Sequence, residues 1–219
     1  MSGFRPEPQP SVTLVSASHE QNPSVAAPNA PYLSEALISL GNLRHNLRCI
    51  RDLTGPQCRI MGIVKANAYG HGAAQVTATL EAEGVRDFGV ANIHEAIELR
   101  QEHPMQPDSR LLAFASPLTE HIALYLQHGV EMTVCDHETV RAAQAIAAAS
   151  GGRLRVQVKV DTGMGRLGVT PEEAAGLLEL IDASPNLELV GIYTHFAESH
   201  KPEGFTARQR ERFLDVTNA

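Results

Sequence analysis

The sequence predicts an α/β protein built as a (β/α)8 barrel of the TIM type, with only about six strand–helix units present. Short apolar runs alternate with segments of helical periodicity, an order that favours parallel strands joined by helical crossovers. Polar residues follow several of these runs directly, as they do at the mouth of a barrel. The G-x-G-x-x-G at 163–168 ends before the helix expected from Pro171 and so does not open a helix directly after a strand, which argues against an open dinucleotide-binding sheet.

Each element is predicted by its own pattern. The strand candidates are short, apolar and rich in β-branched residues, and several helix candidates carry cap residues, such as Thr170-Pro171 at a start and glycine after an end. The expected strands are Arg59 to Val64, Asp87 to Ala91, Arg110 to Phe114, Glu131 to Cys135, Leu154 to Val160 and Leu187 to Tyr193. The expected helices are Leu43 to Leu53, Ala73 to Glu83, Ile93 to Gln101, Leu118 to Gln127, Glu138 to Ala149 and Pro171 to Ile181.

Composition narrows the functional classes. The 219 residues carry a formal charge of −7, which argues against nucleic acid or an anionic membrane as a partner. The local basic cluster at Arg208, Arg210 and Arg212 predicts a solvated helix face. Three cysteines without C-x-x-C spacing favour reduced thiols in the cytoplasm, with no metal site. Residues 1–31, rich in Pro, Ser, Ala and Asn, predict a disordered leader before a barrel domain at 32–219.

Lys65 ends the apolar run Ile60-Met61-Gly62-Ile63-Val64 and begins a polar, glycine-containing stretch. Apolar surroundings disfavour an ammonium group, which makes the neutral amine available to attack an aldehyde such as that of pyridoxal 5'-phosphate (PLP). The alternative is a lysine whose stem lies along the barrel rim and whose charge reaches solvent. Asn67, Tyr69 and the glycines that follow suit the close approach of a small anionic ligand.

The stretch "VKANAYGHG" at 64–72 resembles the PLP-lysine motif of alanine racemases. Three further segments resemble the same family: "ISLGNLRHNLRCIR" at 38–51, "VKVDTGMGRLGV" at 158–169 and "YTHFA" at 193–197. The resemblance runs from about Tyr32 to the last residue. It implies the family's N-terminal barrel, PLP as cofactor, alanine as substrate, D-alanine for peptidoglycan precursors as product, and a homodimer for the complete protein.

The resemblance also implies roles for individual residues. Lys65 would hold PLP and act as the base on one face of the substrate Cα, and Tyr69 would contact the cofactor phosphate. Arg166 would face the cofactor phenol oxygen and the substrate carboxylate, although an arginine after a strand more often forms a surface ion pair. His195 would pack against the pyridine ring. Lys159 would be carbamylated, which removes a cation next to Arg166.

Two features depart from the family pattern. The residues Glu198-Ser199-His200 stand where an aspartate is usual. The family's second base, a tyrosine from the C-terminal β-domain of a partner subunit, has no counterpart among the tyrosines of this chain. We therefore expect a chain that lacks the C-terminal domain and does not racemise alanine alone. The alternatives are an inactive PLP-binding barrel fragment, a racemase with a broader amino-acid range, and a PLP carrier built on a single barrel.

Overall fold

The computed structural model describes residues 36–218, so the leader expected at 1–31 lies outside the described residues. Six strands form one sheet in sequence order, β1 to β6. Helices connect them, as expected for the α/β barrel class. The strands are β1 (Met61–Ile63), β2 (Asp87–Val90), β3 (Arg110–Ala113), β4 (Glu131–Val134), β5 (Leu154–Lys159) and β6 (Leu187–Tyr193).

Two helices, α2 (Lys65–Gly70) and α8 (Phe205–Asn218), lie outside the six expected ranges, and two of the expected helices begin differently. Helix α1 begins at Leu40, three residues before its expected start, because the Ser39 hydroxyl caps it by accepting from Asn42 N. The expected helix at 118–127 begins with the 3₁₀ turn η1 (Thr119–His121), a common first turn. The helices are α1 (Leu40–Thr54), α2 (Lys65–Gly70), α3 (Ala73–Ala82), α4 (Ile93–Glu102), α5 (Ile122–His128), α6 (His137–Ala149), α7 (Pro171–Asp182) and α8 (Phe205–Asn218).

The chain divides into two compact units. Of the described residues, unit 1 comprises 36–88 and Leu99–Ser109, and unit 2 comprises Gly89–Glu98 and 110–218. In unit 1 the core contains Val76, Leu80, Val85 and Phe88. Gly62 of β1 lies so close to these side chains that a Cβ there would be 2.9 Å from Leu80 Cδ1, which explains a glycine inside this strand.

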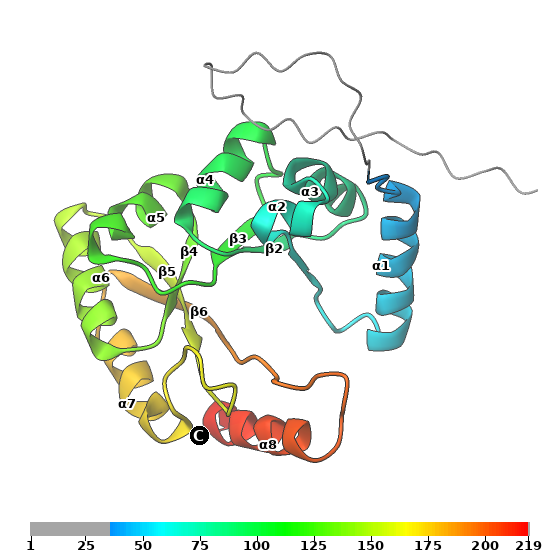
Figure 1. Ribbon diagram of the computed structural model, residues 1–219. Coiled ribbons are helices and arrows are strands. Elements are labelled where there is room, and N and C mark those ends of the chain that lie inside the picture. Colours follow the sequence, from blue (N-terminus) through cyan, green and yellow to red (C-terminus); the bar gives the residue numbers. More distant parts are fainter. Residues whose placement is uncertain (1–35, 219) are drawn as a thin grey trace, which may run out of the picture. The chain divides into compact units, whose positions relative to one another are not determined.

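In unit 2, strands β3 to β6 pair in parallel, and helices α5, α6 and α7 follow one another along one side of them (Figure 1). Alternate residues of β5 point to opposite faces. Val156 and Val158 are fully buried, as are Val140 of α6 and Leu177 of α7. The apolar core of unit 2 contains these side chains, and the other face of β5 carries the polar residues.

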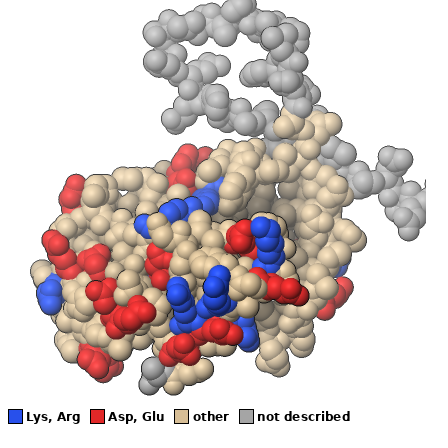
Figure 2. All heavy atoms as spheres, turned by 60° about the horizontal axis from the view of Figure 1, so that its bottom comes forward, with Lys and Arg blue, Asp and Glu red and all other residues tan. Residues whose placement is uncertain are grey.

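The charged surface is mixed. On the face drawn in Figure 2, acidic and basic side chains lie among one another. None of the helices between residues 36 and 218 is both long and apolar enough to cross a membrane. Within the same residues, no group of three or more His, Cys, Asp or Glu side chains could hold a metal ion.

Candidate active site

Lys65 begins a short left-handed helical turn immediately after β1. The next four residues, Ala66 to Tyr69, have φ between +51° and +55° and ψ between +37° and +47°. Non-glycine residues adopt this conformation at a cost of about 1–2 kcal/mol each, and consecutive ones are rare. The sequence predicted a polar loop here and gave no sign of a left-handed turn. Backbone strain of this kind is concentrated at functional sites.

Local hydrogen bonds hold the left-handed turn in place. Ala68 N donates to Val64 O at 2.8 Å, and Gly72 N donates to Asn67 O at 3.0 Å. The Asn67 side chain accepts from Ala73 N at 2.7 Å and so caps the start of α3. Gly70 and Gly72 have φ of +84° and +90°, values that glycine adopts without steric cost. The left-handed turn is therefore anchored at both ends.

The left-handed turn brings the two predicted site residues of unit 1 together. Lys65 Nζ lies 5.9 Å from the centroid of the Tyr69 ring, within cation–π distance. Lys65 is half-buried, while Tyr69 is 61% exposed. No carboxylate among the described residues forms a salt bridge with Lys65. An amine without a competing carboxylate, next to an exposed phenol, suits a ligand that carries an aldehyde and an anionic group.

Arg166 lies on a glycine-rich loop of unit 2 that begins after β5. The loop is closed by a bridge between Val160 and Val169, with Asp161 N donating to Val169 O at 2.8 Å. Gly168 has φ of +142°, and a Cβ there would lie 2.5 Å from Asp161 N. A glycine is therefore required at this crossing of the backbone. Arg166 itself is exposed at the far end of the loop.

The Asp161 carboxylate organises the interior of the same loop. It accepts from Gly163 N at 2.9 Å and from Gly165 N at 2.9 and 3.1 Å. Partial desolvation raises the pKa of Asp161, but backbone N–H groups of the loop, those of Gly165 and Gly163 first, outweigh it and lower that pKa. Asp161 is thus an anion enclosed by its own loop, which fixes the backbone that carries Arg166.

Lys159 lies at the end of β5 with 8% of its surface exposed. It pairs with Tyr193 of β6, and Lys159 Nζ lies 5.8 Å from the Tyr193 ring centroid. The Tyr193 hydroxyl lies 2.9 Å from Thr133 Oγ1, which donates to Ala113 O. Burial raises the pKa of Tyr193 to about 12.

His195 follows β6 by two residues and is exposed. Its backbone carbonyl accepts from Gln209 of α8 at 3.1 Å. The segment after it, where the sequence departs from the family pattern, is held differently: Glu198 forms an ion pair with Lys201 at 2.7 Å, and its carbonyl accepts from Thr206. Arg166, Lys159 and His195 all belong to unit 2, whereas Lys65 and Tyr69 belong to unit 1.

Other polar residues at strand ends have structural roles. Asp136 caps α6 by accepting from Thr139 N at 2.7 Å, and Asn92 accepts from the backbone N–H of His94. The sequence predicted only that polar residues follow several strands at a barrel mouth, and it could not separate caps from site residues. Gln209 was missed altogether, because a polar residue in a helix gives no sign of a buried partner.

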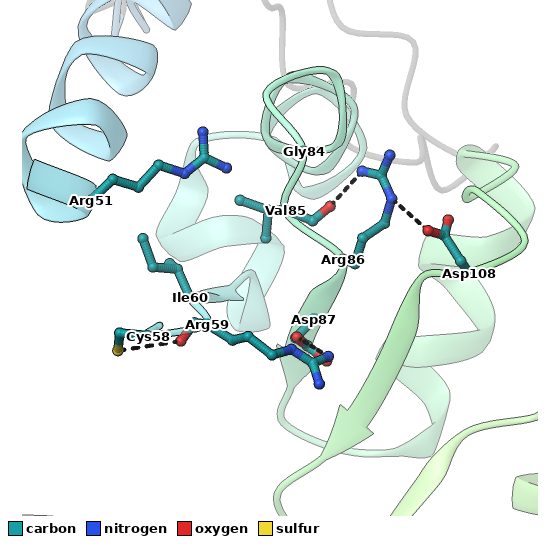
Figure 3. Close-up of a pocket in the computed structure, with 9 residues that line it drawn as sticks. All are labelled: Arg51, Cys58, Arg59, Ile60, Gly84, Val85, Arg86, Asp87 and Asp108. Atoms are coloured by element: carbon teal, nitrogen blue, oxygen red, sulfur yellow. Dashed lines mark hydrogen bonds and ion pairs between the residues drawn. The ribbon is translucent and has the colours of Figure 1, made fainter. Parts of the chain in front are cut away.

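Charged residues also gather where strands begin. In unit 1 a pocket of about 420 Å³ is lined by Arg51, Arg59, Arg86, Asp87 and Asp108 among others (Figure 3). Arg59 donates two hydrogen bonds to Asp87, and Arg86 pairs with Asp108 at 3.0 Å. The charges in this pocket therefore largely neutralise one another, and none of the predicted site residues lines it.

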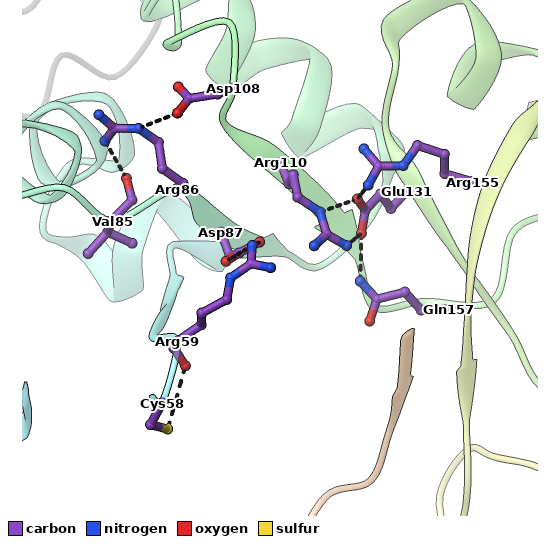
Figure 4. Close-up of polar contacts among 10 residues, drawn as sticks. All are labelled: Cys58, Arg59, Val85, Arg86, Asp87, Asp108, Arg110, Glu131, Arg155 and Gln157. Carbon is purple, nitrogen blue, oxygen red and sulfur yellow. Dashed lines mark hydrogen bonds and ion pairs between the residues drawn. The ribbon is translucent and has the colours of Figure 1, made fainter. Parts of the chain in front are cut away.

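A second ionic cluster, in unit 2, surrounds Glu131 at the start of β4. This carboxylate, whose side chain is 2% exposed, accepts from Arg110 at 2.7 Å, pairs with Arg155 at 3.0 Å, and accepts from Gln157 at 2.6 Å (Figure 4). Two guanidinium groups and an amide compensate the desolvation of the carboxylate. The cluster fixes the starts of β3, β4 and β5 and contains none of the predicted site residues.

Comparison with known proteins identifies the family. The family model for the alanine racemase N-terminal domain matches residues 38–219. An alanine racemase from Chlorobaculum tepidum is 84% identical over 205 residues, which are 94% of this chain and 53% of the relative. This chain thus spans about half the length of the curated relatives it matches.

Solved structures agree with the sequence relatives. Alanine racemase from Clostridium difficile 630 in complex with cycloserine superposes with a TM-score of 0.76 at 34% identity, covering 82% of this chain and 49% of that one. A histidine racemase from Leuconostoc mesenteroides superposes with a TM-score of 0.75 at 25% identity, covering 82% of this chain and 48% of that one. The chain belongs to the alanine racemase N-terminal domain family.

Proposed function

We propose that this chain is the PLP-binding part of an alanine racemase that interconverts L- and D-alanine. The observation that carries the proposal is Lys65: its amine, directly after β1, lies on a strained left-handed turn next to the exposed Tyr69 phenol. The 84% identity to an alanine racemase supports the choice of substrate. The residues present fit PLP, because an amine for the aldehyde and a phenol for the phosphate lie on one turn.

Each residue contributes a defined function in this proposal. Lys65 and Tyr69 hold the cofactor, His195 packs against its ring, and Arg166 binds the substrate carboxylate through its planar guanidinium. When bound, PLP supplies an electron sink that makes the substrate Cα–H acidic. The Lys65 amine accepts the proton from Cα on one face and returns one on the same face in the reverse direction.

Racemisation also requires a proton on the opposite face of Cα. We propose that a tyrosine of the C-terminal part, provided by a partner subunit in a homodimer, donates or accepts that proton. One proton leaves one face as one arrives on the other, so the substrate changes configuration without a net loss of atoms. Lys159, buried next to Tyr193, carries a carbamate in this proposal, which replaces a buried cation with an anion that pairs with Arg166.

The proposed product, D-alanine, is a precursor of peptidoglycan, and the proposal includes a cytoplasmic location for the protein. Its three cysteines, Cys49, Cys58 and Cys135, are all free thiols, in agreement with a reducing compartment. A second candidate function is a racemase that accepts larger amino acids. The superposition on a histidine racemase favours keeping this candidate.

The first experiment tests cofactor capture in the 219-residue chain. The chain contains three lysines, Lys65, Lys159 and Lys201, so borohydride reduction after incubation with PLP, followed by peptide mass analysis, locates the modified amine. We expect the modification at Lys65 and none at Lys201, the exposed control. Modification that persists unchanged in Lys65→Ala would contradict the proposal. The unreduced peptide containing Lys159, kept in bicarbonate without acid, should carry the added mass of CO2.

The second experiment tests activity in a completed enzyme, defined as residues 1–219 followed by the remaining C-terminal part of the Chlorobaculum tepidum alanine racemase. The high identity of that relative makes its second half a compatible partner. We expect D-alanine from L-alanine with the completed enzyme and none with its Lys65→Ala variant. A panel that includes L-histidine decides between the two candidate functions. A folded completed enzyme that racemises no amino acid would refute both.

A further inference from the structure

Gln209 of α8 is a fully buried amide that connects two segments far from it in the sequence. Its Nε2 donates to Thr162 Oγ1 at 3.1 Å and to His195 O at 3.1 Å, and its Oε1 accepts from Ala197 N at 2.9 Å. Gln209 and Thr162 both have no exposed surface. Both amide protons and one carbonyl lone pair are thus used in a site without solvent.

The hydrogen bonds that begin at Gln209 have a single possible direction. Thr194 Oγ1 donates to Val160 O at 2.9 Å, which uses the only proton of that hydroxyl. Thr162 Oγ1, 2.8 Å from Thr194 Oγ1, must then donate to it and can only accept from Gln209. The order of donation therefore runs from Gln209 to Thr162, to Thr194, and ends at the Val160 carbonyl.

The two connected segments carry two of the proposed site residues. Thr162 lies in the loop whose backbone Asp161 fixes as far as Gly165, directly before Arg166. His195 and Ala197 lie on the segment that follows β6. The contact with α8 is also close: Phe205 packs so tightly on Gly163 that a Cβ there would lie 2.7 Å from its ring. Arg212 donates to Thr162 O at 3.2 Å.

We infer that Gln209 is a positioning residue that holds the Arg166 loop and the His195 segment in a fixed arrangement. This inference rests on the proposed function for its effect on catalysis. The hydrogen-bonded connection that Gln209 makes between the two segments, called the tie below, can be measured without activity. Gln209 touches neither substrate nor cofactor in this inference. It acts through Thr162 on one side and through the His195 carbonyl on the other.

Hydrogen–deuterium exchange of the 219-residue chain tests the tie directly. Gln209→Met keeps the length of the side chain but removes its donors and its acceptor. We expect the peptides covering 161–169 and 193–198 to exchange about tenfold faster or more, because a buried amide network is lost. Unchanged exchange in both peptides of the folded variant would overturn the inference.

Gln144 provides a matched control. It is also a helical glutamine that binds a loop, with Asn186 N donating to its Oε1 at 3.0 Å and its Nε2 donating to Asn186 Oδ1 at 3.1 Å. Asn186 precedes β6, at the end of the strand away from His195. Gln144→Met should therefore speed exchange near 186 and leave 161–169 unchanged. Equal effects of both variants on 161–169 would show general loosening and overturn the inference.

Kinetics of the completed enzyme test the consequence for the site. Because Arg166 binds the substrate carboxylate, a displaced loop should raise KM for alanine about fivefold or more. A variant that only lowers the amount of folded enzyme reduces apparent kcat and leaves KM unchanged. A KM unchanged by Gln209→Met, with kcat lowered as much as by Gln144→Met, would overturn the inference. An inactive parent enzyme would refute the proposed function instead, and exchange would still decide on the tie.

Thr162→Val is the alternative test of the inference if Gln209→Met does not fold. Valine matches threonine in shape and removes only the hydroxyl, so it interrupts the donation from Gln209 to Thr194. The bond from Gln209 to His195 O remains available. We expect faster exchange at 161–169 and a higher KM, with a smaller change at 193–198 than Gln209→Met produces. Unchanged exchange at 161–169 in Thr162→Val would contradict the inference.

Discussion

The carboxylate of Glu81 lies 2.7 Å from Nε2 of His103, and only 3% of the Glu81 side chain is exposed. Ser109 Oγ and Gln106 N also donate to it, the latter at 3.0 Å. Burial raises the pKa of Glu81, but the hydrogen bonds from Ser109, His103 and Gln106 outweigh the desolvation, and its pKa is lowered. Glu81 thus joins α3 to the segment between α4 and β3 in unit 1.

This carboxylate predicts a loss of stability in acid. As the pH falls below about 4.3, the unfolded chain takes up a proton at Glu81 while the folded chain resists it, so stability decreases with decreasing pH. Glu81→Gln should lower the free energy of unfolding by about 1–3 kcal/mol at neutral pH. It should also weaken the decrease of this free energy in acid, as measured by urea unfolding. Glu102→Gln, at an exposed position of α4, is the control. If the free energy of unfolding of Glu81→Gln fell in acid as steeply as that of the parent chain, this assignment would be contradicted.

The crossing at Gly168 predicts a large effect of a single methyl group. Gly168→Ala places a Cβ 2.5 Å from Asp161 N and 2.9 Å from Val160 C, and backbone atoms cannot move aside as a side-chain end can. We expect a loss of about 2–3 kcal/mol or more in urea unfolding, typical of severe overpacking. Gly165→Ala in the same loop, where a Cβ meets nothing within 4 Å, should cost only about 1–2 kcal/mol. Equal losses would mean that the crossing can relax.

The left-handed turn predicts a reversed glycine effect. Alanine to glycine in a right-handed helix costs about 1 kcal/mol, and we expect that loss for Ala78→Gly in α3. At Ala66, where φ is +51°, glycine relieves steric strain, so Ala66→Gly should be neutral or stabilising by about 0.5–1 kcal/mol. Thermal unfolding of the two variants side by side gives the signs. Destabilisation of both by the same amount would argue against a left-handed turn.

Two tyrosines with raised pKa values predict a loss of stability in alkali. Burial raises the pKa of both Tyr193 and Tyr125 to about 12. Between about pH 10 and pH 12 the unfolded chain loses phenolic protons that the folded chain keeps, so stability decreases as the pH rises. Tyr193→Phe and Tyr125→Phe should each reduce the decrease of the free energy of unfolding with rising pH, as measured by urea unfolding. The double variant should reduce it further. A double variant with the parent slope would show that other groups cause this decrease.

Much of the fold followed from the sequence because burial sets the pattern of each strand. The run at 154–160 predicted β5 to within one residue, and Pro171 placed the start of α7 correctly. The family resemblance was confirmed by the matches to alanine racemases. The assignments of Lys65, Tyr69, Arg166, Lys159 and His195 remain predictions.

The features that the sequence did not predict depend on contacts between distant segments. Arg208, Arg210 and Arg212 indicated a solvated face of α8, yet Arg212 also donates to Thr162 O. Which residue of α8 reaches the loop is set by the rotation of the helix about its axis, and no local pattern encodes that rotation. Alanine, asparagine and tyrosine at 66–69 likewise carry no signal for four consecutive left-handed residues.

The tie between Gln209 and Thr162 spans 47 residues of sequence, and this separation has a consequence during synthesis. At a translation rate of about 5–20 residues per second, the ribosome adds Gln209 roughly 2–10 seconds after Thr162. Until then the Thr162 hydroxyl has no amide to donate to it, although the residues of β5 and the loop have already been synthesised. A nascent chain that stalls in this interval would present an unfinished loop to chaperones and proteases.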